Sequence, residues 1–423
     1  MSAPSMSAYN PTAAWDELSG WITNWFHEPD LDALRICLCA AVNHFYTDEK
    51  ALWLLIIGNS GTGKTDLAIN SLSGLPETHI MGSVTPSCFL SSRERGGENN
   101  SLLLRNGASQ MWLFKDFTTF ASMKFESRAE VAARLREIWD GCLVADSGMG
   151  KTLRWEGKVT SIAVATPEFE ESWATLRGLG ERFMTLRWHG TDDVLGALGK
   201  MRAQSGQNGN IKGEIQRLVL ELFDNRRSHA PMPSGPAMEP LDELARIVSV
   251  LRIHIKRDSD AQRSIVQIPA PEFPTRIAMA LGQIMRAHMD LFHRDQPTEQ
   301  EYKLAKRLAI DTIPPVRRRI LDFVPHEKSV SLAVLANNAG IPRVTLRRQL
   351  QELVALNVLQ SEVGTIDDED YRGPYSLTPT FRASANRAGF VFHQPDRTLI
   401  VKKKGRRPSS DPAKAVYDAY YAN

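Results

Sequence analysis

A glycine-rich segment, GNSGTGKT (58–65), follows directly on an apolar run, ALWLLII (51–57), and precedes a helix-like stretch, DLAINSL (66–72). The segment matches the pattern G-x-x-x-x-G-K-[ST]. When a strand precedes such a loop and a helix follows it, the backbone N–H groups of the loop curl around phosphate oxygens. The sequence therefore predicts a strand, a phosphate-binding loop and a helix, and this restricts the chain to folds built around a nucleotide site.

The residues of this loop have expected roles in holding ATP and Mg²⁺. Glycines let the backbone turn tightly without Cβ clashes. Lys64 should neutralise β- and γ-phosphate oxygens, and Thr65 should bind Mg²⁺. A second G-K-T, at 150–152, has Ala145 in place of the first glycine, so we expect another role for it. The expected nucleotide-binding residues are Gly58, Asn59, Ser60, Gly61, Thr62, Gly63, Lys64 and Thr65.

Strands and helices alternate in the first half of the chain. QMWLFKDF (110–117) and VTSIAVATP (159–167) are short apolar runs typical of buried strands, and a helical pattern, SRAEVAARLREIWDG (127–141), lies between them. This alternation predicts an α/β core with a parallel sheet. After Arg187 the patterns are helical almost throughout.

Composition excludes several classes of protein. With 42% hydrophobic and 24% charged residues, the 423-residue chain is typical of globular proteins. Its four cysteines are badly spaced for a zinc site. Since no apolar run approaches the ~20 residues that span a bilayer and the start lacks signal-peptide features, we expect a cytoplasmic protein without a membrane partner. The net charge is +2, but residues 311–423 carry 17 Lys/Arg against 12 Asp/Glu, which favours a nucleic-acid partner for this end.

Asp116 ends the apolar run that follows the loop in the sequence, and an acid at such a strand end holds Mg²⁺ in many ATPases. The glutamate that would polarise the attacking water normally comes next, but Phe117 stands there. Thr118, Glu126 and Glu137 lie nearby in the sequence, and nothing assigns any of them as general base. ATP binding is therefore better supported than hydrolysis.

With the loop, the Asp116 strand and a helical region in this order, the chain resembles the AAA+ ATPases. Residues 142–167 are similar to the stretch of minichromosome maintenance (MCM) helicases in which a pre-sensor hairpin leads into the sensor-1 strand. The resemblance covers roughly residues 31–310. It implies a P-loop AAA+ core with a parallel sheet and an all-helical lid.

The resemblance also implies roles for three further residues. Thr166 stands at the polar sensor-1 position, which reads the γ-phosphate. Arg182 stands where the family has an arginine finger, although Glu181 replaces the serine before it. Arg276 stands near the sensor-2 position, where it would contact the γ-phosphate from the lid side. A finger that reaches a neighbouring subunit implies a homo-oligomer, either a hexamer or a spiral.

In ring helicases the pre-sensor hairpin points into the central channel, where basic residues follow the DNA backbone. Lys151, Arg154 and Lys158 are the candidates here, with Trp155 available to stack on a base. A solvated surface hairpin is the alternative.

Residues 316–379 are typical of a winged helix-turn-helix domain. A turn at 341–343 leads into a helix whose apolar residues share one face, which leaves Arg343, Arg347 and Arg348 for the major groove of DNA. The acidic residues 367–370 in the expected wing count against phosphate contact there, so a protein partner for the wing stays open. The basic residues between 402 and 407 predict either salt-sensitive DNA affinity or a solvated tail.

Together these features predict an ATP-dependent, DNA-acting AAA+ ATPase, a replication helicase or initiator of a phage or mobile element. Two alternatives stay open: a DNA-binding transcriptional regulator switched by ATP, and a loader or remodeller of a replication or mobile-element protein. The expected organisation is an N-terminal extension (1–30), the AAA+ α/β core (31–190), the helical lid (191–312), the winged helix-turn-helix (313–380) and a basic tail (381–423).

Overall fold

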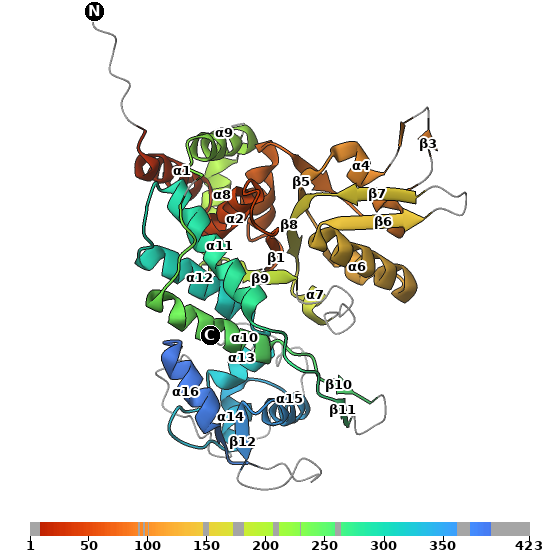
Figure 1. Cartoon of the computed structure of the whole chain (residues 1–423). Coiled ribbons are helices and arrows are strands. Elements are labelled where there is room, and N and C mark those ends of the chain that lie inside the picture. Colours follow the sequence, from red (N-terminus) through yellow and green to blue (C-terminus); the bar gives the residue numbers. More distant parts are fainter. Residues whose placement is uncertain are drawn as a thin grey trace, which may run out of the picture. The chain divides into compact units, whose positions relative to one another are not determined.

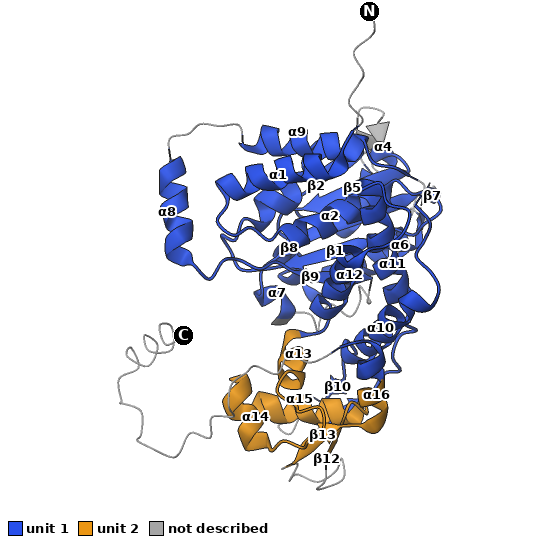
Figure 2. Cartoon of the chain, turned by 90° about the vertical axis from the view of Figure 1, so that its left-hand side faces the viewer, with its two compact units in different colours: residues 1–314, 384–390 blue, residues 315–383, 391–423 orange. Residues whose placement is uncertain are grey.

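The computed structural model describes residues 9–91, 94–95, 98–99, 101–146, 152–171, 182–205, 211–228, 230–258, 264–361 and 373–390. The chain forms two compact units, coloured separately in Figure 2. One comprises residues 1–314 and 384–390, and the other comprises residues 315–383 and 391–423. The first unit contains the expected nucleotide-binding loop, and the second contains the expected DNA-binding arginines from 343 to 348.

A five-stranded parallel sheet lies at the centre of the first unit. In spatial order its strands are β2 (Thr78–Met81), β5 (Ser109–Phe114), β8 (Lys158–Ala165), β1 (Trp53–Ile57) and β9 (Phe183–Arg187). Every neighbouring pair is parallel. The predicted α/β core with a parallel sheet is therefore confirmed, and β1, β5 and β8 are its three predicted strands.

Helices cover both faces of the sheet, as parallel strands joined by crossovers require. Trp53, Leu55 and Ile57 of β1 share an apolar cluster with side chains of α6 (Phe125–Asp140). The residues between them face the opposite surface, because strand side chains alternate, and there α2 (Leu31–His44) packs on β1 and β8. Figure 1 shows α2 and α6 on the two sides of the sheet. All five side chains of β1 are consequently buried, which explains its uninterrupted apolar sequence.

Two groups of helices flank the sheet region within the first unit, formed mainly by the chain after residue 190. One group packs beside the expected nucleotide loop and contains α1 (Pro11–Trp25), α8 (Val194–Gln204) and α9 (Ile211–Asp224), with α9 also against the short helices η1 (Thr65–Asn70) and η2 (Leu72–Gly74). The other contains η4 (Pro236–Met238), α10 (Glu239–Leu251), α11 (Thr275–Leu291) and α12 (Glu299–Asp311). In this second group α11 packs on α2 and α12 packs on β9.

The region predicted to be all helical also contains a β-hairpin. Its strands are β10 (Lys256–Arg257) and β11 (Ile265–Gln267), which pair antiparallel. β-Branched residues favour extended backbone, and Pro269 and Pro271 directly after β11 cannot continue a helix. The prediction of an all-helical lid was wrong at this hairpin.

A second hairpin, β6 (Cys142–Asp146) and β7 (Thr152–Glu156), immediately precedes β8. The remaining short elements of the first unit are α3 (Pro86–Phe89), β3 (Glu94–Arg95), β4 (Glu98–Asn99), α4 (Leu102–Asn106), α5 (Thr118–Ala121) and α7 (Glu168–Glu171). No helix among the described residues is both long enough and apolar enough to cross a membrane.

In its described part, the second unit packs helices with a small antiparallel sheet. Its elements are α13 (Pro315–Leu321), α14 (Leu332–Ala339), α15 (Arg343–Ala355), β12 (Leu359–Ser361), β13 (Tyr375–Leu377) and the first part of α16 (Pro379–Arg387). Gly340 ends α14 in a left-handed conformation, with φ +60°. A buried ion pair, Arg317 to Glu352 at 2.8 Å, joins α13 to α15.

Candidate functional site

The segment 58–65 leaves β1 and enters η1 as a closed loop. Gly61 and Gly63 have φ values of +80° and +77°, a conformation that favours glycine. The hydroxyl of Thr62 and the ammonium of Lys64 both donate to the carbonyl of Asn59, at 2.9 Å and 2.8 Å. The loop therefore curls around the buried Lys64 side chain.

Trp188, just after β9, supports the base of this loop. Its backbone N–H donates to the carbonyl of Ile57 at 2.8 Å, and its indole N–H donates to the carbonyl of Thr62 at 3.2 Å. A Cβ on Gly58 would lie 2.8 Å from the Trp188 carbonyl oxygen, so glycine is required there. The first glycine of the motif thus permits a close contact between two chain segments.

The ends of three adjacent strands meet beside the loop, because β8 lies between β1 and β5. The N–H of Gly58 donates to the carbonyl of Ala165 at 3.3 Å. The N–H of Thr166 donates to the hydroxyl of Thr118 at 3.4 Å, and the N–H of Thr118 donates to Asp116 Oδ1 at 2.9 Å. The structure therefore brings Asp116 and Thr166 together next to the loop.

Two carboxylates act on the charge of Lys64 at this edge. Burial lowers the pKa of Lys64, while the carboxylates of Asp116 and Glu168 act in the opposite direction. Glu168 is the first residue of α7 and is exposed. A hydrogen bond from the Thr166 side chain holds the pKa of Glu168 below its usual value. Sequence reasoning did not single out Glu168, although it lies only two residues after Thr166.

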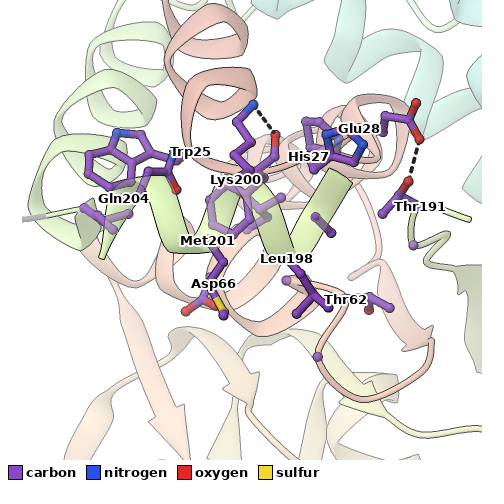
Figure 3. Close-up of a pocket in the computed structure, with 18 of the residues that line it drawn as sticks. Trp25, His27, Glu28, Thr62, Asp66, Thr191, Leu198, Lys200, Met201 and Gln204 are labelled. Carbon is purple, nitrogen blue, oxygen red and sulfur yellow. Dashed lines mark hydrogen bonds between the residues drawn. The ribbon is translucent and has the colours of Figure 1, made fainter. Parts of the chain in front are cut away.

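A pocket of about 1010 Å³ opens on the other side of the loop (Figure 3). Its walls come from residues 25–29 after α1, residues 60–63 of the loop, η1, α8 and the start of α9. In Figure 3, Leu198 and Met201 of α8 lie across from Thr62 and Asp66. Both side chains are among the exposed apolar residues of the chain. A mainly apolar wall with a few polar groups is typical of small-molecule sites, and this one adjoins the expected phosphate loop.

Polar contacts tie α8 to the segment after α1, so the pocket wall is held in place. The Lys200 ammonium donates to the carbonyl of Phe26 at 3.2 Å. Glu28 accepts from the Thr191 hydroxyl at 2.5 Å, and His27 Nε2 lies 3.0 Å from Asp193 Oδ2. The pocket combines segments that lie more than 150 residues apart, and no local sequence pattern marks them as neighbours.

Arg182 and Arg276 converge on one tryptophan. Their guanidinium carbons lie 5.4 Å and 5.1 Å from the ring centroid of Trp139, within cation–π range. Asp140 also pairs with Arg182, at 3.2 Å. Burial is the main cause that lowers the pKa of Arg182.

These two arginines lie far from the loop of the same chain. Trp53 at the start of β1 pairs with Phe183, so Arg182 lies next to the opposite end of the strand from Gly58. At ~3.3 Å per residue the separation is about 20 Å. Neither Arg182 nor its neighbour Arg276 can reach a phosphate group held by its own loop.

The described residues of the β6–β7 hairpin differ in exposure. Arg154 is exposed and pairs with Glu156. Trp155 is buried, and its indole N–H donates to the carbonyl of Gly107 at 3.0 Å, so it cannot stack on a base. Lys158 lies at the start of β8 and donates to the carbonyls of Asn43 and Tyr46, both at 2.7 Å. Its ammonium thereby caps the C-terminal end of α2.

In the second unit, α15 presents Arg343 and Arg347 to solvent, whereas Arg348 is half-buried. Leu346, Leu350 and Leu353 are buried on the other face of the helix. Lys151, the acidic residues 367–370 of the expected wing and the basic tail lie outside the described residues.

No protein-family model matches the chain, and no curated protein is significantly similar to it.

Proposed function

We propose that this chain is a P-loop ATPase of the AAA+ type that acts on DNA as an oligomer. One observation carries the proposal: the G-x-x-x-x-G-K-T loop at the end of β1 lies beside Asp116 and Thr166 at the ends of β5 and β8. A cation, a carboxylate and a hydroxyl at one edge of a parallel sheet are the groups that phosphoryl transfer needs.

The nucleotide would lie across the loop and the adjoining pocket. Its phosphates would bind the backbone N–H groups of the loop and the ammonium of Lys64. Its base would enter the pocket between Phe26 and the apolar face of α8, where Leu198 and Met201 would cover the ring. The pocket's position directly beside the loop supports this orientation.

The residues present fit Mg²⁺ bound together with a nucleotide. Thr65 supplies a hydroxyl and Asp116 a carboxylate, both hard oxygen donors of the kind that Mg²⁺ takes alongside phosphate oxygens and water. When bound, Mg²⁺ would neutralise charge on the phosphates.

An oligomer would give Arg182 and Arg276 a role at a nucleotide site. Because they lie about 20 Å from their own loop, an arginine of this pair could contact the γ-phosphate only of a neighbouring subunit. A contact from the edge of one sheet to the loop of the next subunit repeats head to tail, and such contacts generate rings or helical spirals.

The second unit supports DNA as the partner. We interpret α13, α14, the turn before α15, α15 itself and the antiparallel pair β12–β13 as a winged helix-turn-helix. The exposed Arg343 and Arg347 lie in the first turns of α15, where a recognition helix contacts base edges or phosphates.

A second candidate function is an ATP-switched regulator that hydrolyses little. Phe117, at the position of the usual glutamate, is buried among Phe114, Phe120, Phe169 and Phe183. This position is therefore committed to the core and supplies no group to polarise water.

The test is ATP binding and turnover by wild type and Lys64→Ala, each without DNA, with single-stranded DNA and with duplex DNA. Loss of a charge-assisted contact worth roughly 1.5–3 kcal/mol should weaken binding of a fluorescent ATP analogue about 10- to 100-fold. Lys124→Ala, which removes an exposed lysine elsewhere in the unit, is the matched control.

Turnover that needs Lys64 and rises with DNA would support the DNA-acting ATPase. Tight binding with negligible turnover under every condition would favour the switch. Absence of ATP binding by wild type would overturn both.

A further inference from the structure

The proposed reaction needs a group that accepts the proton of the attacking water. The residue after Asp116 cannot supply it, because Phe117 is 2% exposed and apolar. Any such group must lie at the edge of the sheet where β1, β5 and β8 end.

The strand order identifies the segment that reaches this edge between the loop and Asp116. β8 is hydrogen-bonded to β1 on one side and to β5 on the other, and Ala165 is opposite Ile57. Neighbouring strands are ≈ 4.8 Å apart, so the chain emerging from β8 lies one strand away from both the loop and Asp116. Thr166, Pro167 and Glu168 are the residues that emerge there.

Contacts within the segment 166–169 fix the position of Glu168 at this edge of the sheet. The N–H of Phe169 donates to the carbonyl of Thr166 at 3.0 Å, which closes a tight turn at the start of α7. Phe169 is buried and anchors the turn, while the Glu168 side chain is exposed. The Thr166 side chain is hydrogen-bonded to the Glu168 carboxylate.

Two other described carboxylates near the strand ends are bound by neighbouring side chains. Glu170 is bound by Arg187 at 2.8 Å and 3.2 Å, and Asp66 accepts from the Asn70 side chain at 2.9 Å on the pocket side of the loop. Among the described carboxylates, those whose charge acts on Lys64 are Asp116 and Glu168. With Asp116 assigned to Mg²⁺, Glu168 remains.

We propose that Glu168 is the general base for the water that attacks the γ-phosphate, with Thr166 as the residue that positions its carboxylate. This inference rests on the proposed ATPase function and deepens it. The Glu168 carboxylate takes a proton from water as the water oxygen bonds to the γ-phosphorus. The bond from that phosphorus to the β–γ bridging oxygen breaks, and its electron pair leaves with ADP. The proton on Glu168 then passes to solvent, so the products are ADP, phosphate and one proton.

The test compares Glu168→Gln with wild type for two quantities: affinity for a fluorescent ATP analogue with Mg²⁺, and the rate of phosphate release. The amide keeps the shape of the side chain but cannot accept a proton, and general bases contribute about 10²–10⁴ in rate. We expect turnover to fall at least about 100-fold while affinity changes less than about threefold. Because the side chain is exposed, the variant should keep the wild-type unfolding midpoint.

Glu126→Gln is the matched control. Glu126 is an exposed glutamate in the first turn of α6, the helix that comes after Asp116 in the sequence. This variant should turn over ATP at the wild-type rate. Equal losses in the two variants would overturn the assignment of Glu168, as would unchanged turnover in Glu168→Gln or a parallel loss of affinity and turnover. If wild type does not bind ATP, the proposed function fails first. If wild type binds ATP without hydrolysing it, the general base is refuted while nucleotide binding stands.

Discussion

Replacing Lys158 with methionine should change how stability depends on pH. The Lys158 ammonium is held among the carbonyls at the end of α2, and burial lowers its pKa from 10.5 to about 8 despite the opposing charges of Glu49 and Asp48. At 1.36 kcal/mol per pH unit, this fall corresponds to about 3 kcal/mol of cost for keeping the charge in the folded state.

The direction in which stability changes with pH follows from proton binding by the two states. Below pH 8 both states hold the proton, and the folded state bears the full cost. Between pH 8 and 10.5 the folded state has lost its proton while the unfolded state still binds one, so stability rises with pH. Wild type should therefore gain about 2 kcal/mol relative to Lys158→Met between pH 8 and pH 10, out of the total of about 3.

Urea unfolding followed by tryptophan fluorescence at several pH values measures this difference. Other groups titrate in the same range, but they are common to both proteins and cancel in the comparison. Parallel pH profiles would refute the reasoning. If the profiles are parallel and Lys158→Met weakens binding to single-stranded DNA, Lys158 is a DNA contact rather than a cap for α2.

Two further predictions concern packing in each unit. Gly157→Ala should lower the free energy of unfolding by about 1–3 kcal/mol, because the added Cβ would lie 1.9 Å from the Ala108 carbonyl oxygen. Gly199 has open space around it, so Gly199→Ala should leave the free energy of unfolding unchanged. Equal losses for the two variants in denaturant unfolding would contradict the prediction. Arg317→Met should lower the free energy of unfolding by about 3–5 kcal/mol, because Glu352 would stay buried without its cation. The double variant Arg317→Met/Glu352→Leu should recover most of that loss in thermal unfolding, and a double variant as unstable as the single one would count against it.

The central part of the fold is readable from the sequence, whereas its edges are not. β1, β5 and β8 are buried on both faces, so each appears as a continuous apolar run. β2, with the sequence THIM, is a partly exposed edge strand whose short, mixed sequence gives little signal. β9 was missed as well, because its run FMTLR is short and contains a polar residue in the middle.

Parts of the site depend on contacts between distant segments and could not be read from spacing. Lys158 follows an expected basic hairpin in the sequence, and this position favours a DNA contact. In the structure its ammonium donates to carbonyls at the end of α2, a segment more than 100 residues earlier in the chain. Trp155 is likewise buried by the segment before β5 rather than exposed. That Asp116 and Thr166 lie close together could be predicted, because each stands within two residues of the end of a buried strand, and parallel strands end at a common edge.

The strand order also has a consequence during translation. β1 pairs only with β8 and β9 within the described sheet, and β8 begins at Lys158, about 100 residues after Ile57. At ~5–20 residues per second, the ribosome needs about 5–20 s to supply that partner. Throughout this interval the nascent chain carries an uncharged apolar strand, WLLII, without a neighbour, and such segments are prone to aggregate. An early strand of this protein therefore waits without its partner strands until the middle of the chain emerges.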